Sequence, residues 1–292
     1  MRIEHQDVQA NGITFHVASS GSVDAPVIFC VHGFPEGWQS WRPVMEEMGD
    51  EAHMFALDLR GYPGTDRPKG GYDVFTLIDD IKAVIEALGL EKPLLLTHDW
   101  GGALGWLFAH RYPHLIRKLM VVNCPHLKTL TRAVFRFEDL QTVRIFWVPI
   151  FLVPWLPEWF LTTALGRWIL KRSFTLREGE KGTMDVALVE ELVSRYRKAA
   201  DMRGPIDYYR AFVKTMLVPK TRRQLNALYE SPITVPTTVV WGAAENLLSA
   251  KVALNSGKDA GCDLDWRPLP RVGHFVTLEA HAKLSREIRR VL

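Results

Sequence analysis

KPLLLTHDWGG, residues 92–102, is a short apolar run that ends in a charged residue followed by two glycines. The run Pro93–Leu96 has the length and the flanks of a buried parallel strand, and the residues from Gly101 onward have the composition of a helix packed closely on a sheet. A strand that passes straight into a helix through T-H-D-W-G is typical of a nucleophile elbow. The pattern predicts that Asp99 lies at the top of the sheet, beside a backbone N–H that faces the substrate.

Asp99 stands where the common hydrolase elbow has serine. A carboxylate at this place can displace a leaving group at a saturated carbon and form an alkyl ester. Taken alone, an Asp-x-Gly sequence is more often the N-cap of an ordinary helix. The rest of the chain favours the nucleophile.

The composition is that of a globular protein with a sizeable core. The chain has 292 residues, of which 47% are hydrophobic and 24% charged, and its net charge of +3 is too small to indicate nucleic-acid binding. The cysteines Cys30, Cys124 and Cys262 lie far apart, and the first two stand in apolar runs. We therefore expect reduced thiols and a cytoplasmic location.

No segment of the sequence has the pattern of a signal peptide or an integral membrane helix. The first twelve residues lack an apolar run, and the apolar stretch from Ile145 to Leu170 is interrupted by Pro149, Pro154 and Pro157.

The apolar segments predict an α/β sheet interrupted once. Two short segments flank Asn11-Gly12, the strongest hairpin signal, and later strands alternate with helical spacing, as in a parallel sheet. Strands are expected at 3–10, 13–19, 26–31, 54–59, 93–96, 118–123, 237–241 and 264–269, and helices at 74–88, 247–256 and 278–292. Residues 125–225 show helical spacing and no clear strand, so we predict a helical lid there, between core segments 1–124 and 226–292.

Three further loops supply candidate catalytic groups. The turn HGFPE, residues 32–36, follows a buried strand and can present the N–H of Phe34 beside that of Trp100 as a pocket for an oxyanion. Glu245 follows the strand at 237–241, and His274 precedes the last helix. Asp99, Glu245 and His274 run in the order nucleophile, acid, base that α/β-hydrolases have. The acid could instead follow the preceding strand, at 118–123, but Asn123 at its end has no carboxylate.

With these motifs the chain resembles the epoxide hydrolases of the α/β-hydrolase superfamily. The resemblance spans nearly the whole length and is carried by HGFPE at 32–36, DLRGY at 58–62, HDWGG at 98–102, PIDYYR at 205–210, WGAAE at 241–245 and GHF at 273–275. It implies a mostly parallel eight-stranded sheet with a helical lid, and hydrolysis of an epoxide by water to a vicinal diol, with no cofactor or metal. Asp99 would open the epoxide, Tyr209 would protonate its oxygen, and Glu245 with His274 would activate water.

The chain departs from the family pattern at three positions. Thr97 stands where the elbow usually has glycine, and Glu245 replaces the commoner aspartate. The stretch 143–149 lacks the first of two lid tyrosines, and Trp147 occupies its place by spacing. An indole N–H donates a hydrogen bond but does not transfer its proton. Tyr209 would therefore have to supply the proton to the epoxide oxygen. The many aromatic residues of the predicted lid favour an apolar or aromatic epoxide.

Two other functions remain open. A haloalkane or haloacid dehalogenase uses the same ester chemistry, and Trp100 with Trp147 could bind a halide; Phe34 and Tyr209 favour the epoxide. A ligand receptor on this fold would need no triad. The oligomeric state is also open, a homodimer being one outcome. We expect His32 and His98 to be structural, and Asp58 and Arg60 to form an ion pair or to be solvated.

Overall fold

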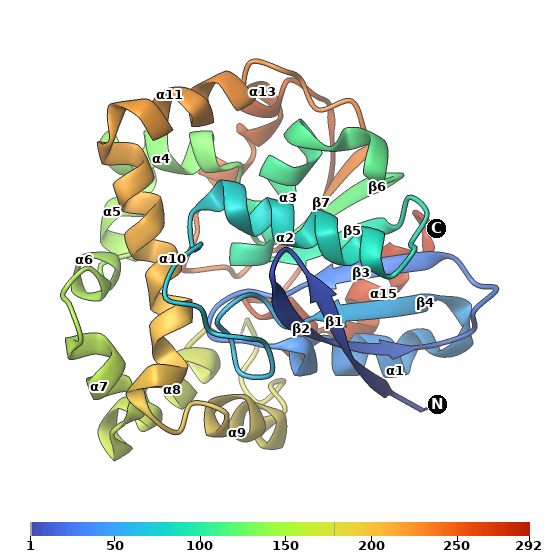
Figure 1. Cartoon of the computed structure of the whole chain (residues 1–292), viewed down its shortest axis with the longest axis horizontal. Helices are drawn as coiled ribbons and strands as arrows, with labels where there is room; N and C mark the ends of the chain where they lie inside the picture. Colours follow the sequence, from blue (N-terminus) through green and yellow to red (C-terminus); the bar gives the residue numbers. More distant parts are fainter. Residues whose placement is uncertain (1, 178) are drawn as a thin grey trace.

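The computed structural model describes residues 2–177 and 179–292, and eight strands form one sheet in them (Figure 1). The order across the sheet is β1-β2-β4-β3-β5-β6-β7-β8. All neighbours from β4 to β8 pair in parallel, whereas β1, β2 and β4 pair antiparallel. The predicted α/β-hydrolase fold with a mostly parallel eight-stranded sheet is confirmed. The strands are β1 Glu4–Ala10, β2 Ile13–Ser20, β3 Val27–Val31, β4 His53–Leu57, β5 Leu94–His98, β6 Lys118–Val122, β7 Thr237–Gly242 and β8 Leu264–Leu269.

Helices cover both faces of the sheet, and the alternation of side chains along each strand divides the core between them. On β3, Phe29 and Val31 pack in the cluster that contains α2 and α3, while Ile28 and Cys30 pack in the cluster that contains α1 and α15. Every residue of β5 is buried, because this central strand is covered on both faces. The helices are α1 Arg42–Met48, α2 Val74–Ala87, α3 Trp100–Arg111, α12 Ala250–Ala253, α13 Ser256–Ala260, α14 Val276–Glu279 and α15 His281–Arg289, with 3₁₀ turns η1 Trp38–Trp41, η2 Gly49–Glu51 and η3 Pro113–Leu115.

Between β6 and β7 the described residues form helices and loops but no strand. We call residues 127–228 the helical insertion. It comprises α4 Leu127–Phe135, η4 Glu138–Leu140, α5 Gln141–Arg144, α6 Val148–Phe151, α7 Leu156–Thr162, α8 Ala164–Thr175, α9 Val186–Ser194, α10 Ala199–Leu217 and α11 Pro219–Leu228. Figure 1 shows α10 running between the sheet and the insertion helices α5, α6 and α7. This arrangement brings α10 over the end of the sheet at which β5 meets α3.

Two predicted helices are broken. The helix expected at 247–256 is replaced by α12 and α13, and α12 begins only at Ala250 because the Ser249 side chain caps it by accepting from the N–H of Val252. The helix expected at 278–292 is divided into α14 and α15 at Ala280, whose backbone angles of φ −145° and ψ 34° are not helical. Apolar spacing alone does not detect either break.

Among residues 2–177 and 179–292, no single helix is long and apolar enough to span a membrane. The segments Glu138–Phe151 and Leu156–Thr162 meet the length and composition criteria only together, and they are bent by 96° at the break between them.

Candidate active site

Asp99 lies at the sharp turn between β5 and α3. Its backbone angles, φ 49° and ψ −118°, are outside the regions that side-chain-bearing residues usually occupy. The turn brings Gly101 so close to β3 that a Cβ atom there would lie 2.1 Å from the carbonyl oxygen of Val31. Only glycine fits, as the predicted elbow requires.

The threonine that replaces the usual elbow glycine is accommodated by a second glycine. Thr97 is buried on β5, and its hydroxyl donates to the carbonyl of Met120 at 3.2 Å. A Cβ atom on Gly105 of α3 would lie 2.9 Å from the Thr97 side chain. Because Gly105 has no side chain, the helix leaves room for the Thr97 side chain. The elbow therefore keeps its shape.

The two carboxylate oxygens of Asp99 have different neighbours. Oδ1 accepts a hydrogen bond of 2.8 Å from the backbone N–H of Phe34, and Oδ2 lies 3.6 Å from Nε2 of His274. Burial would raise the pKa of Asp99, but His274, the charge of His98 and the Phe34 N–H outweigh it and hold the pKa below its ordinary value. Asp99 is therefore an ionised carboxylate at neutral pH.

His274 is held by its other ring nitrogen. Nδ1 lies 2.5 Å from Oε2 of Glu245, whereas Nε2 has no hydrogen-bond partner in the described part of the chain, although the residue is fully buried. Burial would lower the pKa of His274, but the charge of Glu245 and the approach of Asp99 raise it to about 10. Since Nδ1 faces a carboxylate, Nε2 is the nitrogen that can exchange a proton with the site.

The extra methylene of Glu245 is absorbed by a dense set of hydrogen bonds. Oε1 accepts from the N–H groups of Leu247 at 2.5 Å and Leu248 at 3.1 Å, and Oε2 accepts from Nδ2 of Asn123 at 2.7 Å. Burial would raise the pKa of Glu245, but His274 and these donors keep it below its ordinary value. The carboxylate is thus ionised and fixed against the imidazole.

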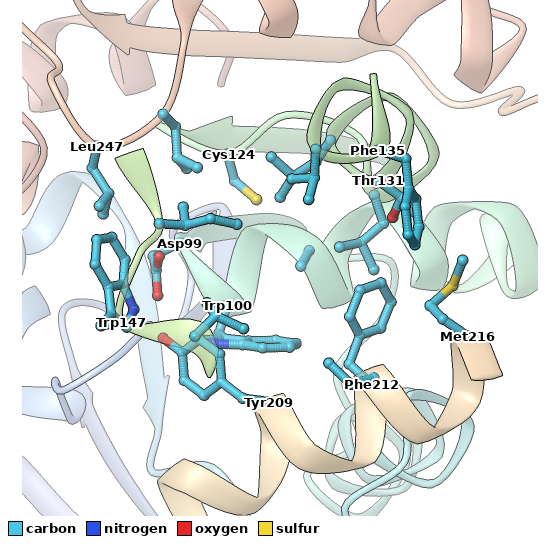
Figure 2. Close-up of a pocket in the computed structure, with 18 of the residues that line it drawn as sticks. Asp99, Trp100, Cys124, Thr131, Phe135, Trp147, Tyr209, Phe212, Met216 and Leu247 are labelled. Atoms are coloured by element: carbon cyan, nitrogen blue, oxygen red, sulfur yellow. The ribbon is translucent and has the colours of Figure 1, made fainter. Parts of the chain in front are cut away.

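Tyr209 projects from α10 toward Asp99. Figure 2 shows its hydroxyl, the indole nitrogen of Trp147 and the Asp99 carboxylate grouped at one end of a cavity. The Tyr209 ring meets the Trp100 ring edge-on, with 5.0 Å between centroids. Burial and the charge of Asp99 raise the pKa of Tyr209 well above its ordinary value, and hydrogen bonds with Trp100 and Trp147 offset this only in part. The phenol is therefore protonated at neutral pH and can act as a donor.

The cavity beside Asp99 measures about 220 Å³ and has an almost entirely apolar lining. Asp99, Trp100, Trp147 and Tyr209 line it, while Phe34 contributes its backbone N–H to Asp99 and its ring to contacts with Tyr209. The other lining residues are Ala103, Cys124, Leu127, Leu130, Thr131, Val134, Phe135, Ile145, Val148, Phe212, Val213, Met216, Leu217, Leu247 and Leu248. All seven predicted site residues thus lie together.

Comparison with known proteins agrees with this geometry. The alpha/beta hydrolase fold family matches residues 26–149. Mouse epoxide hydrolase 3 is 33% identical over 280 residues, which make up 94% of this chain and 73% of the mouse protein. This chain belongs to the epoxide hydrolase family of the α/β-hydrolase superfamily. Human epoxide hydrolase 4 is 32% identical over 84% of this chain and 66% of its own length. An epoxide hydrolase from Vigna radiata with a known crystal structure is 25% identical in sequence. Its structure matches this one with a TM-score of 0.81 over 99% of this chain and 97% of the Vigna radiata chain.

Membership of the epoxide hydrolase family confirms the resemblance that the motifs indicated. It also confirms the predicted class of enzyme, a hydrolase.

The structure also reveals two supporting residues to which the sequence motifs assigned no role. Asn123 binds Glu245, donates to the carbonyl of Gly273 at 2.9 Å and accepts from the N–H of Gly242 at 2.7 Å. It therefore connects the loops that carry the acid and the base. The sequence gives one indication of this role, because Asn123 follows β6 at the alternative position for the catalytic acid.

Glu36 is the second such residue in this epoxide hydrolase family member. Its Oε2 accepts from the N–H of Gly33 at 2.7 Å and faces Nδ1 of His98 at 2.8 Å, while Nε2 of His98 donates to the carbonyl of His274 at 2.9 Å. The predicted structural role of His98 therefore has a definite form, because this chain of contacts joins the Phe34 turn to the His274 loop.

The expectation for Asp58 and Arg60 is wrong, since the two neither pair nor face solvent. Arg60 binds Asp80 through two hydrogen bonds of 2.6 Å, and Asp58 accepts from Arg195 at 2.7 Å. Both side chains point to partners far away in the sequence, which local spacing does not identify.

Proposed function

We propose that this protein hydrolyses apolar or aromatic epoxides to vicinal diols through a covalent ester on Asp99. One observation carries the proposal: the ionised Asp99 carboxylate and the partner-free Nε2 of His274 meet beside an apolar cavity. Names of relatives, including mouse epoxide hydrolase 3, support the same reaction.

In the first step Oδ2 of Asp99 attacks one ring carbon of the epoxide. The C–O bond of the ring breaks, and its electron pair goes to the epoxide oxygen, which takes the proton of Tyr209. The Trp147 indole, next to the Tyr209 hydroxyl, can stabilise the developing negative charge by donating its N–H. The product is an alkyl ester of Asp99 with a neighbouring hydroxyl group, and Tyr209 is left as a phenolate.

Ester formation changes the charge that His274 experiences. The pKa of His274 is raised partly by the Asp99 carboxylate, and an ester has no such charge, so the imidazolium becomes more acidic at this stage. The proton that His274 releases can restore Tyr209. The neutral Nε2 then accepts a proton from water that attacks the ester carbonyl.

The oxyanion formed by that attack needs donors, and the Phe34 N–H already binds Oδ1 of Asp99. The Trp100 N–H is the second donor that we propose. When the tetrahedral intermediate collapses, the bond to the substrate oxygen breaks, the carboxyl proton passes to that oxygen, and the diol leaves. Asp99 is again a carboxylate and His274 is again protonated.

We also propose that residues 125–225 act as a lid on a core formed by residues 1–124 and 226–292. Tyr209 and Trp147 come from the helical insertion and Asp99, Glu245 and His274 from the core, so the site would need both. The reduced thiols Cys30, Cys124 and Cys262 support a cytoplasmic location.

Dehalogenation is a second candidate, favoured by one observation. Figure 2 shows the indole nitrogen of Trp147 near the Tyr209 hydroxyl at the Asp99 end of the cavity, and the Trp100 ring meets the Tyr209 ring edge-on. Two indole N–H groups at this place could equally bind a halide displaced from a haloalkane by Asp99.

A single turnover of styrene oxide in ¹⁸O-labelled water, with the protein in excess, tests the proposal. We expect label in the Asp99 carboxylate and an unlabelled first diol, because water attacks the ester. Direct labelling of the diol would exclude the ester, and halide release from a parallel haloalkane reaction without diol formation from epoxides would favour dehalogenation.

A further inference from the structure

The helical insertion has an unusually apolar surface. In the part of the chain that the structure describes, 20 large apolar side chains are exposed, and 18 of them lie in this insertion. Monomeric proteins rarely expose large contiguous apolar patches without an interaction partner. The exposed side chains are Phe135, Phe137, Leu140, Val143, Phe146, Ile150, Leu152, Val153, Trp155, Leu156, Trp159, Leu165, Trp168, Ile169, Leu176, Val186, Leu217 and Val218.

The helical insertion also carries a net positive charge. Residues 127–228 contain 18 Lys and Arg against 10 Asp and Glu, a formal charge of +8, which leaves −5 for the rest of the chain. Between residues 140 and 177 Glu158 is the sole acidic residue, and it is buried and bound to Arg210. The stretch that carries most of the exposed aromatic residues therefore presents cations such as Arg172 but no free carboxylate.

The cavity beside Asp99 opens on this surface. Phe135, at the end of α4, and Leu217, at the end of α10, both line the cavity, and they are 71% and 73% exposed. Figure 2 places Phe135 and Met216 at the opposite end of the cavity from Asp99. Figure 1 shows α5, α6 and α7 along one side of the molecule, away from the sheet, and α4 leads into α5 through η4. The cavity mouth and the apolar helices thus share one side.

We propose that this side of the helical insertion binds the surface of an anionic lipid bilayer. Trp155, Trp159 and Trp168 would lie at the level of the lipid headgroups, where tryptophan is favoured, and the surrounding Arg and Lys side chains would bind lipid phosphates. Bound in this way, the protein takes an apolar epoxide from the bilayer through the mouth at Phe135 and Leu217. The delivery step rests on the proposed epoxide hydrolysis, whereas bilayer binding does not.

Charge favours the bilayer over a second copy of this chain. In a two-fold dimer built on this face, residues 140–177 of one copy would meet the same residues of the other, so five Lys and Arg on each side would be opposed while Glu158, their sole acidic residue, is already bound to Arg210. An anionic bilayer offers both the apolar interior and the missing negative charge. Its attraction for the protein should weaken at high salt.

Sedimentation of the 292-residue protein with vesicles tests the proposal. We expect binding to phosphatidylcholine vesicles that contain phosphatidylglycerol, weaker binding without it, and quenching of tryptophan fluorescence by brominated lipids. Trp155→Asn combined with Trp159→Gln should reduce binding about tenfold or more, because two apolar side chains no longer enter the bilayer. Asparagine suits position 155, whose φ is +56°. Arg172→Gln should reduce binding about fivefold.

Matched controls replace exposed residues outside the insertion. Val23→Ser combined with Leu254→Gln removes the two large apolar side chains that are exposed outside the insertion among the described residues, and Lys69→Gln removes an exposed cation of the core. These variants should bind vesicles like the wild type. Equal binding by the Trp155 and Trp159 variant, or a dimer in light scattering that this variant abolishes while vesicles are not bound, overturns the proposal.

Rates of epoxide hydrolysis separate bilayer binding from catalysis. Trp155 and Trp159 do not line the cavity, so their variant should hydrolyse a water-soluble epoxide at the wild-type rate and lose rate only with an epoxide dissolved in vesicles. A protein that binds vesicles but hydrolyses neither epoxide would retain the docking surface and refute the proposed function.

Discussion

Nε2 of His274 lies 3.6 Å from Oδ2 of Asp99 with no hydrogen bond between them, while Nδ1 of the same ring is fixed by Glu245 at 2.5 Å. The imidazole therefore has one occupied and one available nitrogen. A polar separation beyond 3.5 Å is one that water commonly bridges. In this arrangement His274 can act as a base on water after Asp99 has reacted with the substrate.

His274→Gln should trap the ester. Asp99 keeps its place and can still open an epoxide, but the ester then has no base to activate water. Mass spectrometry of the variant after addition of styrene oxide should show a gain equal to the whole substrate, whereas a haloalkane would add its mass less the hydrogen halide. The double variant with Asp99→Ala should give no adduct. Absence of an adduct from the single variant, with substrates that the wild type turns over, would refute the two-step mechanism.

Tyr209→Phe should slow ester formation much more than ester hydrolysis. The phenol protonates the epoxide oxygen, and loss of a general acid typically costs 10²–10⁴-fold. Rapid-quench measurement of the two steps separates them. Tyr208→Phe is the matched control, because this adjacent hydroxyl is buried and donates to the carbonyl of Arg60 instead of facing the cavity. A Tyr209 variant within about fivefold of the wild-type rate would assign the proton to another donor.

The fold was predictable because its signals are local. The turn at Asn11-Gly12 shows positive φ at both residues, as the hairpin signal requires, and each predicted strand is present within two residues of its expected ends. The elbow could also be predicted, because apolar strand, Asp99 and Gly101 are adjacent in the sequence. The broken helix at Ala280 was not, since its interruption depends on how the segment packs.

The supporting residues of the site were harder to predict, because their partners lie far away in the sequence. Asn123 meets Glu245 across 122 residues, and Glu36 meets His98 across 62. Asp58 and Arg60, two positions apart, bind Arg195 and Asp80 instead of each other. Residue type indicates that a buried charge needs a partner, but only the sheet order determines which one is near.

Trp147→Phe tests whether the indole substitutes for a second lid tyrosine. The change keeps an aromatic ring and removes the N–H beside the Tyr209 hydroxyl, so ring opening should slow on the order of 10²-fold, as for loss of one oxyanion donor. Trp147→Tyr restores a donor and should recover most of the rate. If the Phe and Tyr variants react equally fast, the role of Trp147 is packing against Arg177 and the cavity.

The raised pKa of His274 predicts how stability depends on pH. Its value of about 10 in the folded protein exceeds the ordinary 6.5, so the folded state binds a proton more tightly than the unfolded state. The resulting stabilisation is fully present below pH 6.5, declines as the pH rises, and is lost above pH 10. Asp99 and Glu245 have lowered pKa values and stay ionised throughout this range.

His274→Gln lacks this titrating group and keeps the others, which makes it the reference for the measurement. We expect the melting temperature of the wild type relative to the variant to fall between pH 6.5 and 10, because the wild type alone loses the bound proton there. Scanning fluorimetry of both proteins in matched buffers gives the difference directly. A difference that stays constant across this interval would mean that His274 is neutral in the free enzyme, and the proton that restores Tyr209 after ring opening would then have to come from solvent.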